Sequence, residues 1–103
     1  RGRDGLPPFG RLAAIIVSAE TRPEAEAHAK ALRRAAPDVH GIDVLGPAEA
    51  PLAMVRGRYR FRLVVRAERK ADIQTYLRAM VKNAPKPRGS IQVQLDVDPQ
   101  SFL

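Results

Sequence analysis

The sequence has 103 residues and no cysteine, which excludes disulfides, thiol chemistry and cysteine-ligated zinc within this chain. It has no run of about 18 apolar residues, so no transmembrane helix is expected, and it shows no signal peptide. It also lacks a G-x-x-x-x-G-K phosphate loop. Ser18, Ser90 and Ser101 have no glycine elbow of the kind that serves a serine nucleophile. These absences predict a chain without catalytic residues or a membrane anchor, and they fit a reducing cytoplasm.

Positive charge, by contrast, is abundant and unevenly distributed. Eighteen Lys and Arg oppose eleven Asp and Glu, for a formal net charge of +7. Residues 56–70 hold seven basic residues against Glu68 alone, so this one segment contributes +6 of that total. Such a local concentration favours a polyanionic partner: nucleic acid, an acidic peptide or anionic lipid.

The length predicts a single domain. Residues 1–11 are rich in Gly, Pro and Arg and are expected to form an irregular linker ahead of a domain over residues 12–103. Because the chain does not begin with Met, we expect it to be a fragment of a longer protein.

Six elements follow the linker in the predicted order β-α-β-β-α-β. The apolar run 12–19 predicts a central strand. Thr21 with Glu24 three residues later has capping-box spacing, and Pro23 fits the first turn of a helix that Pro37 would end. The narrow apolar face of that helix is expected to comprise Ala25, Ala29, Leu32 and Ala36.

The second half of the chain supplies the remaining elements. Residues 42–48 predict a short strand, and residues 46–57 a connecting loop whose Leu52, Met54 and Val55 pack on the core. A strand is expected from about Gly57 to Ala67, a helix over 69–83 and a last strand over 91–97. The expected inward-facing residues of the last two elements are Ile73, Leu77, Met80 and Val81, then Ile91, Val93, Leu95 and Val97.

Residues 58–66 alternate in character. Tyr59, Phe61, Leu63 and Val65 occupy odd positions, whereas the even positions hold Arg58, Arg60, Arg62, Val64 and Arg66. Since successive strand side chains point to opposite faces, the aromatic and aliphatic residues should build the core and the arginines should face away from it. With both helices on one side of the sheet, as in a ferredoxin-like α+β fold, the other side stays open. The first and third strands are then central.

Three segments resemble one known family: PPFGRLAAI (7–15), VLGPAEAPLAMVRGRYRFRLVVRA (44–67) and LDVDPQSFL (95–103). They are similar to the C-terminal domain of bacterial primosomal protein N′, the PriA-type replication-restart DNA helicase. Glu49 departs from the pattern, because the family often has Pro there. The resemblance implies a domain similar to ribosomal protein S10, attached to an ATP-dependent helicase that moves 3′ to 5′.

The same resemblance implies the working context. The parent would use ATP, magnesium and zinc, all held upstream, and this chain would hold no cofactor. Its partners would be forked or single-stranded DNA, single-stranded DNA-binding protein and the helicase core of the same polypeptide, in the cytoplasm at the nucleoid, with no membrane. A ribosome-associated role rests on fold analogy alone.

The residues of the arginine row are the first candidate site: Arg56, Arg58, Arg60, Arg62 and Arg66. Guanidinium groups bind phosphate through planar paired donors and stack on unpaired bases. Three readings stay open: contact with DNA, docking on the helicase core, or a solvated face neutralised by Asp96 and Asp98.

The expected start of the second helix is the next candidate, because free backbone N–H groups there favour anions. Arg69 and Lys70 lie at that start, and Gln74 would follow Lys70 by one turn. The resemblance implies that they hold the acidic, Phe-ending tail of single-stranded DNA-binding protein. No metal site is expected, since His28 and His40 have no second ligand at metal spacing.

Overall fold

The computed structural model describes residues 9–55 and 57–97, and within these ranges every side chain except those of residues 9 and 51–55. The elements follow the predicted β-α-β-β-α-β order. They are β1 (Phe9–Ala19), α1 (Arg22–Ala35), β2 (Ile42–Val55), β3 (Arg58–Glu68), α2 (Ile73–Asn83) and β4 (Gln92–Val97). Neither helix in this part of the chain is long and apolar enough to cross a bilayer.

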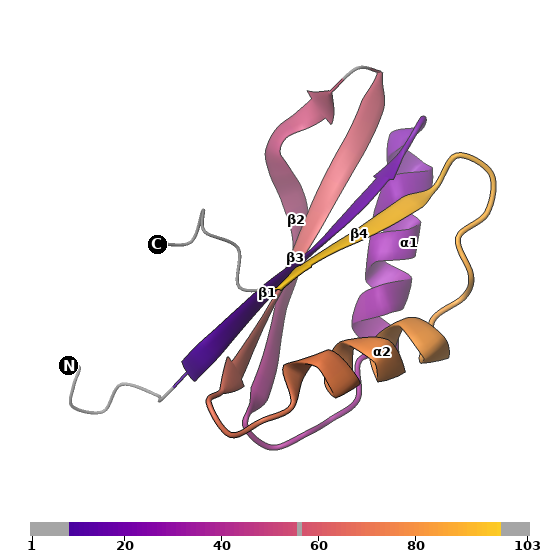
Figure 1. Cartoon of the computed structure of the whole chain (residues 1–103). Coiled ribbons are helices and arrows are strands. Elements are labelled where there is room, and N and C mark those ends of the chain that lie inside the picture. Colours follow the sequence, from indigo (N-terminus) through magenta and orange to yellow (C-terminus); the bar gives the residue numbers. More distant parts are fainter. Residues whose placement is uncertain (1–8, 56, 98–103) are drawn as a thin grey trace.

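The four strands form one antiparallel sheet in the order β2-β3-β1-β4. β1 and β3 are therefore central, and both helices lie on one side of the sheet (Figure 1). This is the ferredoxin-like α+β topology, and it confirms the predicted fold class. The opposite side of the sheet carries no helix or strand of the described chain.

The core lies between the sheet and the two helices. Ile15 and Val17 of β1 and Leu63 and Val65 of β3 have no solvent exposure, and Phe61 is buried beside them. Tyr59 packs against the same cluster. The alternation in β3 is therefore confirmed: its odd positions are buried from Phe61 to Ala67, with Tyr59 partly buried, and its even positions are partly exposed.

Helix α1 forms as its sequence predicts. Thr21 is the N-cap, and its Oγ1 accepts a hydrogen bond from the Glu24 backbone N–H at 3.3 Å. Ala25 and Ala29 are fully buried, so a narrow stripe of methyl groups lets the helix lie close to the sheet. The helix ends with Ala36 as C-cap, directly before Pro37.

The predicted start of α2 at residue 69 is wrong. β3 continues to Glu68, whose backbone N–H donates to the Gly41 carbonyl at 2.9 Å, and this bond draws the chain into the sheet. A turn follows, and Asp72 is the N-cap, accepting from the Thr75 N–H at 3.1 Å. Val81 was expected to be buried but is 40% exposed, whereas Tyr76 takes a core position that the sequence analysis did not assign.

Two further boundaries differ from expectation. β1 begins at Phe9, so residues 9–11 pair as strand. β2 runs on to Val55, because Met54 and Val55 pair with Tyr59 and Arg58 where a loop was predicted. Two irregularities of register make this possible, one of them at Gly46, whose φ is +101° and whose added Cβ would lie 2.8 Å from the Arg62 carbonyl oxygen. The side chains of Leu52, Met54 and Val55 lie outside the described residues.

The extended β2–β3 hairpin contacts the start of α1. Glu49 Oε2 lies 3.3 Å from Arg22 Nη1, and the Arg22 guanidinium lies 5.8 Å from the centroid of the Phe61 ring. Glu49, the departure from the family pattern, thus has a charged partner of its own.

Candidate nucleic-acid interface

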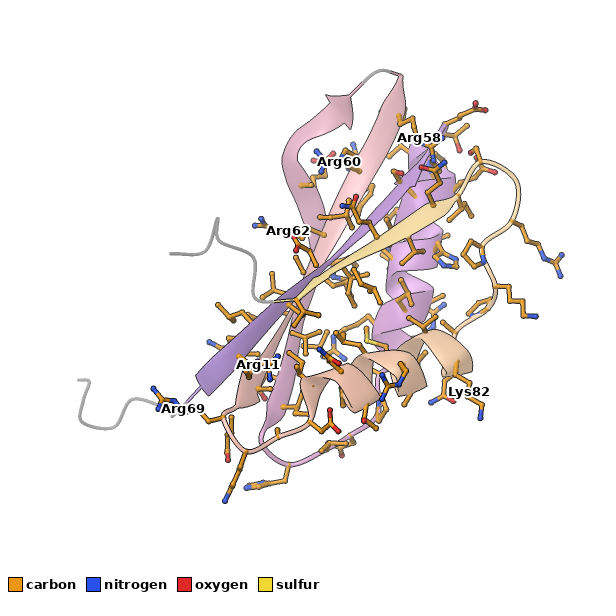
Figure 2. The ribbon with its side chains drawn as sticks, viewed as in Figure 1. Arg11, Arg58, Arg60, Arg62, Arg69 and Lys82 are labelled. Carbon is orange, nitrogen blue, oxygen red and sulfur yellow. The ribbon has the colours of Figure 1, made fainter. Side chains whose placement is uncertain are left out.

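The open side of the sheet is built by cross-strand rows. Paired residues of antiparallel strands share a face, so Arg62 of β3 lies beside Ile16 of β1, and Arg60 lies beside Ser18. Gln94 and Gln92 of β4 extend these two rows. Figure 2 shows Arg60 and Arg62 on the side of the sheet away from both helices. Two of the predicted site residues are thereby placed in the middle of the open face.

The open face also carries aliphatic side chains. Leu45 is paired with Val64 and is 46% exposed. Val64 in turn pairs with Ala14. Leu45 was not among the predicted site residues. The face therefore presents guanidinium groups next to an apolar strip.

Arg66 has an acidic neighbour on this face. Its Nη2 lies 3.3 Å from Asp43 Oδ2, across the β2–β3 pair. In one of the three readings of the arginine row, Asp96 and Asp98 were the neutralising carboxylates. Asp96 does lie on the open face, paired with Ala14, whereas Asp98 lies outside the described residues. Asp43 was missed because the facing strand was known only as a range, without a register.

Arg58 has a structural role at the end of the sheet. Its Nη2 donates to the Ser18 carbonyl at 3.1 Å and to the Ser90 carbonyl, and its Nε donates to Ser18 Oγ at 3.3 Å. The guanidinium therefore joins β3 to the end of β1 and to the entry of β4. Arg56, the remaining residue of the predicted row, lies outside the described residues.

The three residues of the second predicted site are not brought together as expected. Arg69 and Lys70 precede the N-cap Asp72, so neither belongs to the first helical turn. The side chain of Arg69 lies against Gly10, where an added Cβ would be 1.9 Å from its Cγ. The carboxylate of Asp72 already serves the helix N-terminus, and the hydrogen bond from the Thr75 hydroxyl is the first cause of its lowered pKa. The Asp72 carboxylate of the chain itself therefore occupies the position at the helix N-terminus where an external anion was expected.

Lys70 instead lines a groove between α2 and the α1–β2 connection. The groove has a volume of about 440 Å³ and includes the apolar side chains of Val39, Ile42 and Ala79. Tyr76 forms part of its wall and donates from its hydroxyl to the Pro37 carbonyl at 2.6 Å. Burial raises the pKa of Tyr76, so the phenol stays protonated and keeps this hydrogen bond. Arg69 and Gln74 do not line the groove.

In the described part of the chain, no group of three His, Cys, Asp or Glu side chains is placed to hold a metal ion. His28 is 7% exposed on α1, and burial lowers its pKa. At pH 7 its imidazole is therefore neutral.

The fold and the site together define a small ferredoxin-like domain. Its sheet face opposite the helices is basic, and among the described residues this face carries no covering helix or strand and no recognisable catalytic grouping. The model of the family "Primosomal protein N C-terminal domain" matches residues 4–100. The chain belongs to this family.

Relatives with the name "Replication restart protein PriA" match over nearly the whole chain. The protein of Treponema pallidum is 35% identical over 100 residues, which cover 95% of this chain and 15% of the relative. The protein of Rickettsia felis is 31% identical over 97 residues, covering 94% of this chain and 15% of the relative. The "Probable replication restart protein PriA" of Deinococcus radiodurans is 38% identical, covering 92% and 10%. The chain thus spans between a tenth and a sixth of the length of these relatives.

Proposed function

We propose that this chain is a non-catalytic DNA-binding domain of a replication-restart helicase, and that it grips forked or single-stranded DNA through the open face of its sheet. The observation that carries the proposal is the position of Arg60 and Arg62 on the uncovered side of a central strand. Guanidinium groups bind phosphate oxygens in pairs and stack on unpaired bases. The aliphatic side chains beside them, among them Ile16, offer contact to bases that have lost their stacking partners.

The motor would lie elsewhere in the polypeptide. The family and the names of the relatives support a role in replication restart. In this proposal ATP, magnesium and zinc belong to other domains of the helicase. This domain would hold the substrate while the motor moves along it.

The test compares two double variants that lose the same charge. Fluorescence anisotropy of labelled fork, single-stranded and duplex DNA is measured with the wild-type chain, with Arg60→Ala/Arg62→Ala and with Arg33→Ala/Arg34→Ala. The last pair is exposed at the end of α1, on the helix side of the sheet. If the open face binds DNA, only the first variant loses affinity. Loss of two phosphate contacts should also reduce the slope of log K against log salt by about 1.8 for duplex DNA.

Two results would overturn the assignment. Equal losses in both variants would mean that only net charge matters. Unchanged DNA affinity of Arg60→Ala/Arg62→Ala would exclude the open face as a DNA-binding surface. It would favour docking of this face on the helicase core.

A second candidate function, that of a protein-docking module, has an observation of its own. Lys70 stands at the groove lined by Val39, Ile42 and Ala79, so a cation lies beside an apolar depression. The lysine and the apolar lining favour the acidic, Phe-ending tail that the family resemblance implies for single-stranded DNA-binding protein, although Glu68 and Asp72 line the same groove and would repel carboxylates placed near them. An acidic peptide that ends in Phe, with a blocked N-terminus, should bind the chain. The substitution Lys70→Glu should abolish this binding. Retained binding in Lys70→Glu would exclude the groove.

A further inference from the structure

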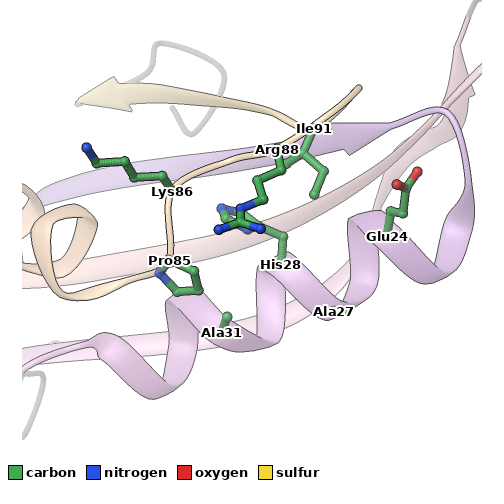
Figure 3. A pocket seen from close by; sticks show the side chains of 8 residues that line it. All are labelled: Glu24, Ala27, His28, Ala31, Pro85, Lys86, Arg88 and Ile91. Atoms are coloured by element: carbon green, nitrogen blue, oxygen red, sulfur yellow. The ribbon is translucent and has the colours of Figure 1, made fainter.

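A second depression lies on the helix side of the sheet, between α1 and the segment that connects α2 to β4 (residues 84–91). Figure 3 shows the residues that line it. Its volume is about 550 Å³. Ala27 and Ala31 of α1 form its floor, and Pro85, Lys86, Arg88 and Ile91 form the facing wall. We refer to it as the α1 cleft. Neither the arginine face nor the groove at Lys70 shares a residue with it.

The floor of the α1 cleft is apolar and open. Ala27 and Ala31 are one helical turn apart, and their short side chains leave room for an incoming group. Pro85 and Ile91 add apolar surface on the other side. The imidazole of His28, neutral because burial lowers its pKa, completes this lining. A depression of this kind can accept an aliphatic side chain together with neighbouring parts of a peptide.

The wall of the cleft carries two cations. Lys86 and Arg88 are both exposed, and neither forms an ion pair with a residue that the structure describes. Pro85 and Pro87 restrict the backbone that carries Lys86 and Arg88. Binding a ligand there therefore costs little additional backbone conformational entropy. Figure 3 shows Lys86 and Arg88 on the same connection, with the Arg88 guanidinium beside His28 of α1 and the Lys86 side chain extending away from the helix.

The acid of the cleft is already engaged. Glu24 lies at the start of α1, and its Oε1 accepts from Thr21 Oγ1 at 3.0 Å and from Ser90 Oγ at 3.5 Å. It therefore belongs to the cap of the helix. The two cations are left to meet negative charge from outside the domain.

From this arrangement we propose that the α1 cleft docks an acidic peptide segment of a partner protein. One aliphatic side chain of the peptide sits on Ala27 and Ala31, and its carboxylates meet Lys86 and Arg88. Nucleic acid fits less well, because the two alanines of the floor are apolar and the cations stand along one wall only. The proposal goes beyond the proposed function, since it uses neither the open sheet face nor Lys70.

The experiment follows the amide spectrum of the ¹⁵N-labelled chain during titration with a capped peptide, acetyl-Glu-Asp-Leu-Asp-Glu-amide. The expected shifts gather at Ala27, Ala31, Lys86 and Arg88. Lys86→Ala/Arg88→Ala removes two partly exposed ion pairs and should weaken binding by about tenfold. Two comparisons accompany it: Arg34→Ala/Lys82→Ala, which loses the same charge outside the cleft, and the charge-reversed peptide with Lys in place of each acid.

In Arg34→Ala/Lys82→Ala the affinity should change less than about twofold, and the charge-reversed peptide should not bind. Ala27→Leu fills the floor from an exposed position and should weaken binding by about fivefold without unfolding the chain. If Lys86→Ala/Arg88→Ala fails to fold, Ala27→Leu alone tests whether the peptide binds in the α1 cleft. Equal losses in the two double variants, or shifts away from the cleft, would overturn the proposal. So would a short duplex DNA that moves the same amides and displaces the peptide.

Discussion

Replacement of Arg58 by alanine tests whether this residue belongs to the fold or to the binding face. Its guanidinium donates to the carbonyls of Ser18 and Ser90 and to the Ser18 hydroxyl. These acceptors lie on β1 and at the entry of β4, 40 and 32 residues away in sequence. The substitution therefore disconnects three segments at one end of the sheet.

The expected magnitude follows from these contacts. A hydrogen bond from a charged donor contributes about 1.5–3 kcal/mol, and an acceptor left without a partner adds a cost. Because Arg58 is only half-buried, water replaces part of what is lost, so we expect about 2 kcal/mol in total. For a domain of this size, each kcal/mol corresponds to roughly 4–8 °C in Tm, which predicts a decrease of roughly 8–16 °C.

Thermal unfolding followed by circular dichroism measures this decrease directly. Arg62→Ala is the matched control, since Arg62 lies on the same strand and the same face, with no hydrogen bond or ion pair recorded to a described residue. It should change stability by less than about 0.5 kcal/mol. Arg58→Lys should recover only part of the loss, because one ammonium group cannot reach all of these acceptors in the planar geometry of a guanidinium. A Tm for Arg58→Ala within about 2 °C of wild type would refute the structural role.

Two other substitutions probe the helix layer. Ala29→Leu inserts a larger side chain between α1 and the sheet, at a position with no solvent exposure, and should lower the free energy of unfolding in urea by about 1–3 kcal/mol. Ala27→Leu, on the exposed face of α1, should be nearly neutral. Equal effects of the two substitutions would contradict the close contact of α1 with the sheet. His28→Gln should flatten the dependence of stability on pH. Because burial lowers the pKa of His28 below its ordinary value of about 6.5, the unfolded chain binds more protons between pH 7 and pH 5, so wild-type stability falls as the pH falls through that range. Urea midpoints at pH 7 and pH 5 measure this, and exposed His40→Gln should keep the wild-type slope; if His28→Gln keeps it too, the buried imidazole is not the cause.

Local patterns carried most of the fold prediction. The alternation in β3 depends only on strand geometry, and the cap at Thr21 depends on groups three residues apart. Both were predicted and both are confirmed. Asp72 followed by Thr75 was a comparable local signal for the true start of α2, but the basic pair at Arg69 and Lys70 drew the predicted helix too far towards the N-terminus.

The wrong predictions concern strand boundaries and burial, which depend on partners far away in the sequence. β2 was predicted to end at residue 48, because Pro47, Pro51 and the glycines around them indicate a loop. In the fold, pairing with β3 continues to Val55, and the extra residues are absorbed by shifts of register at Gly46 and beyond Glu49. For Leu95 the orientation was predicted but the degree of burial was not. It faces the helix layer as expected, yet it is 42% exposed because β4 is an edge strand.

The sequence by itself therefore determined the order of the elements, the family and the division of β3 into an apolar and a basic side. These properties follow from side-chain period, from capping chemistry and from motifs that are continuous in the chain. Only the tertiary structure decided the separate roles of the arginines. Register places Asp43 beside Arg66, the end of β1 supplies acceptors to Arg58, and the open centre of the sheet is left to Arg60 and Arg62. The physical reason is that each of these contacts joins residues far apart in sequence, so it exists only once the strands have paired.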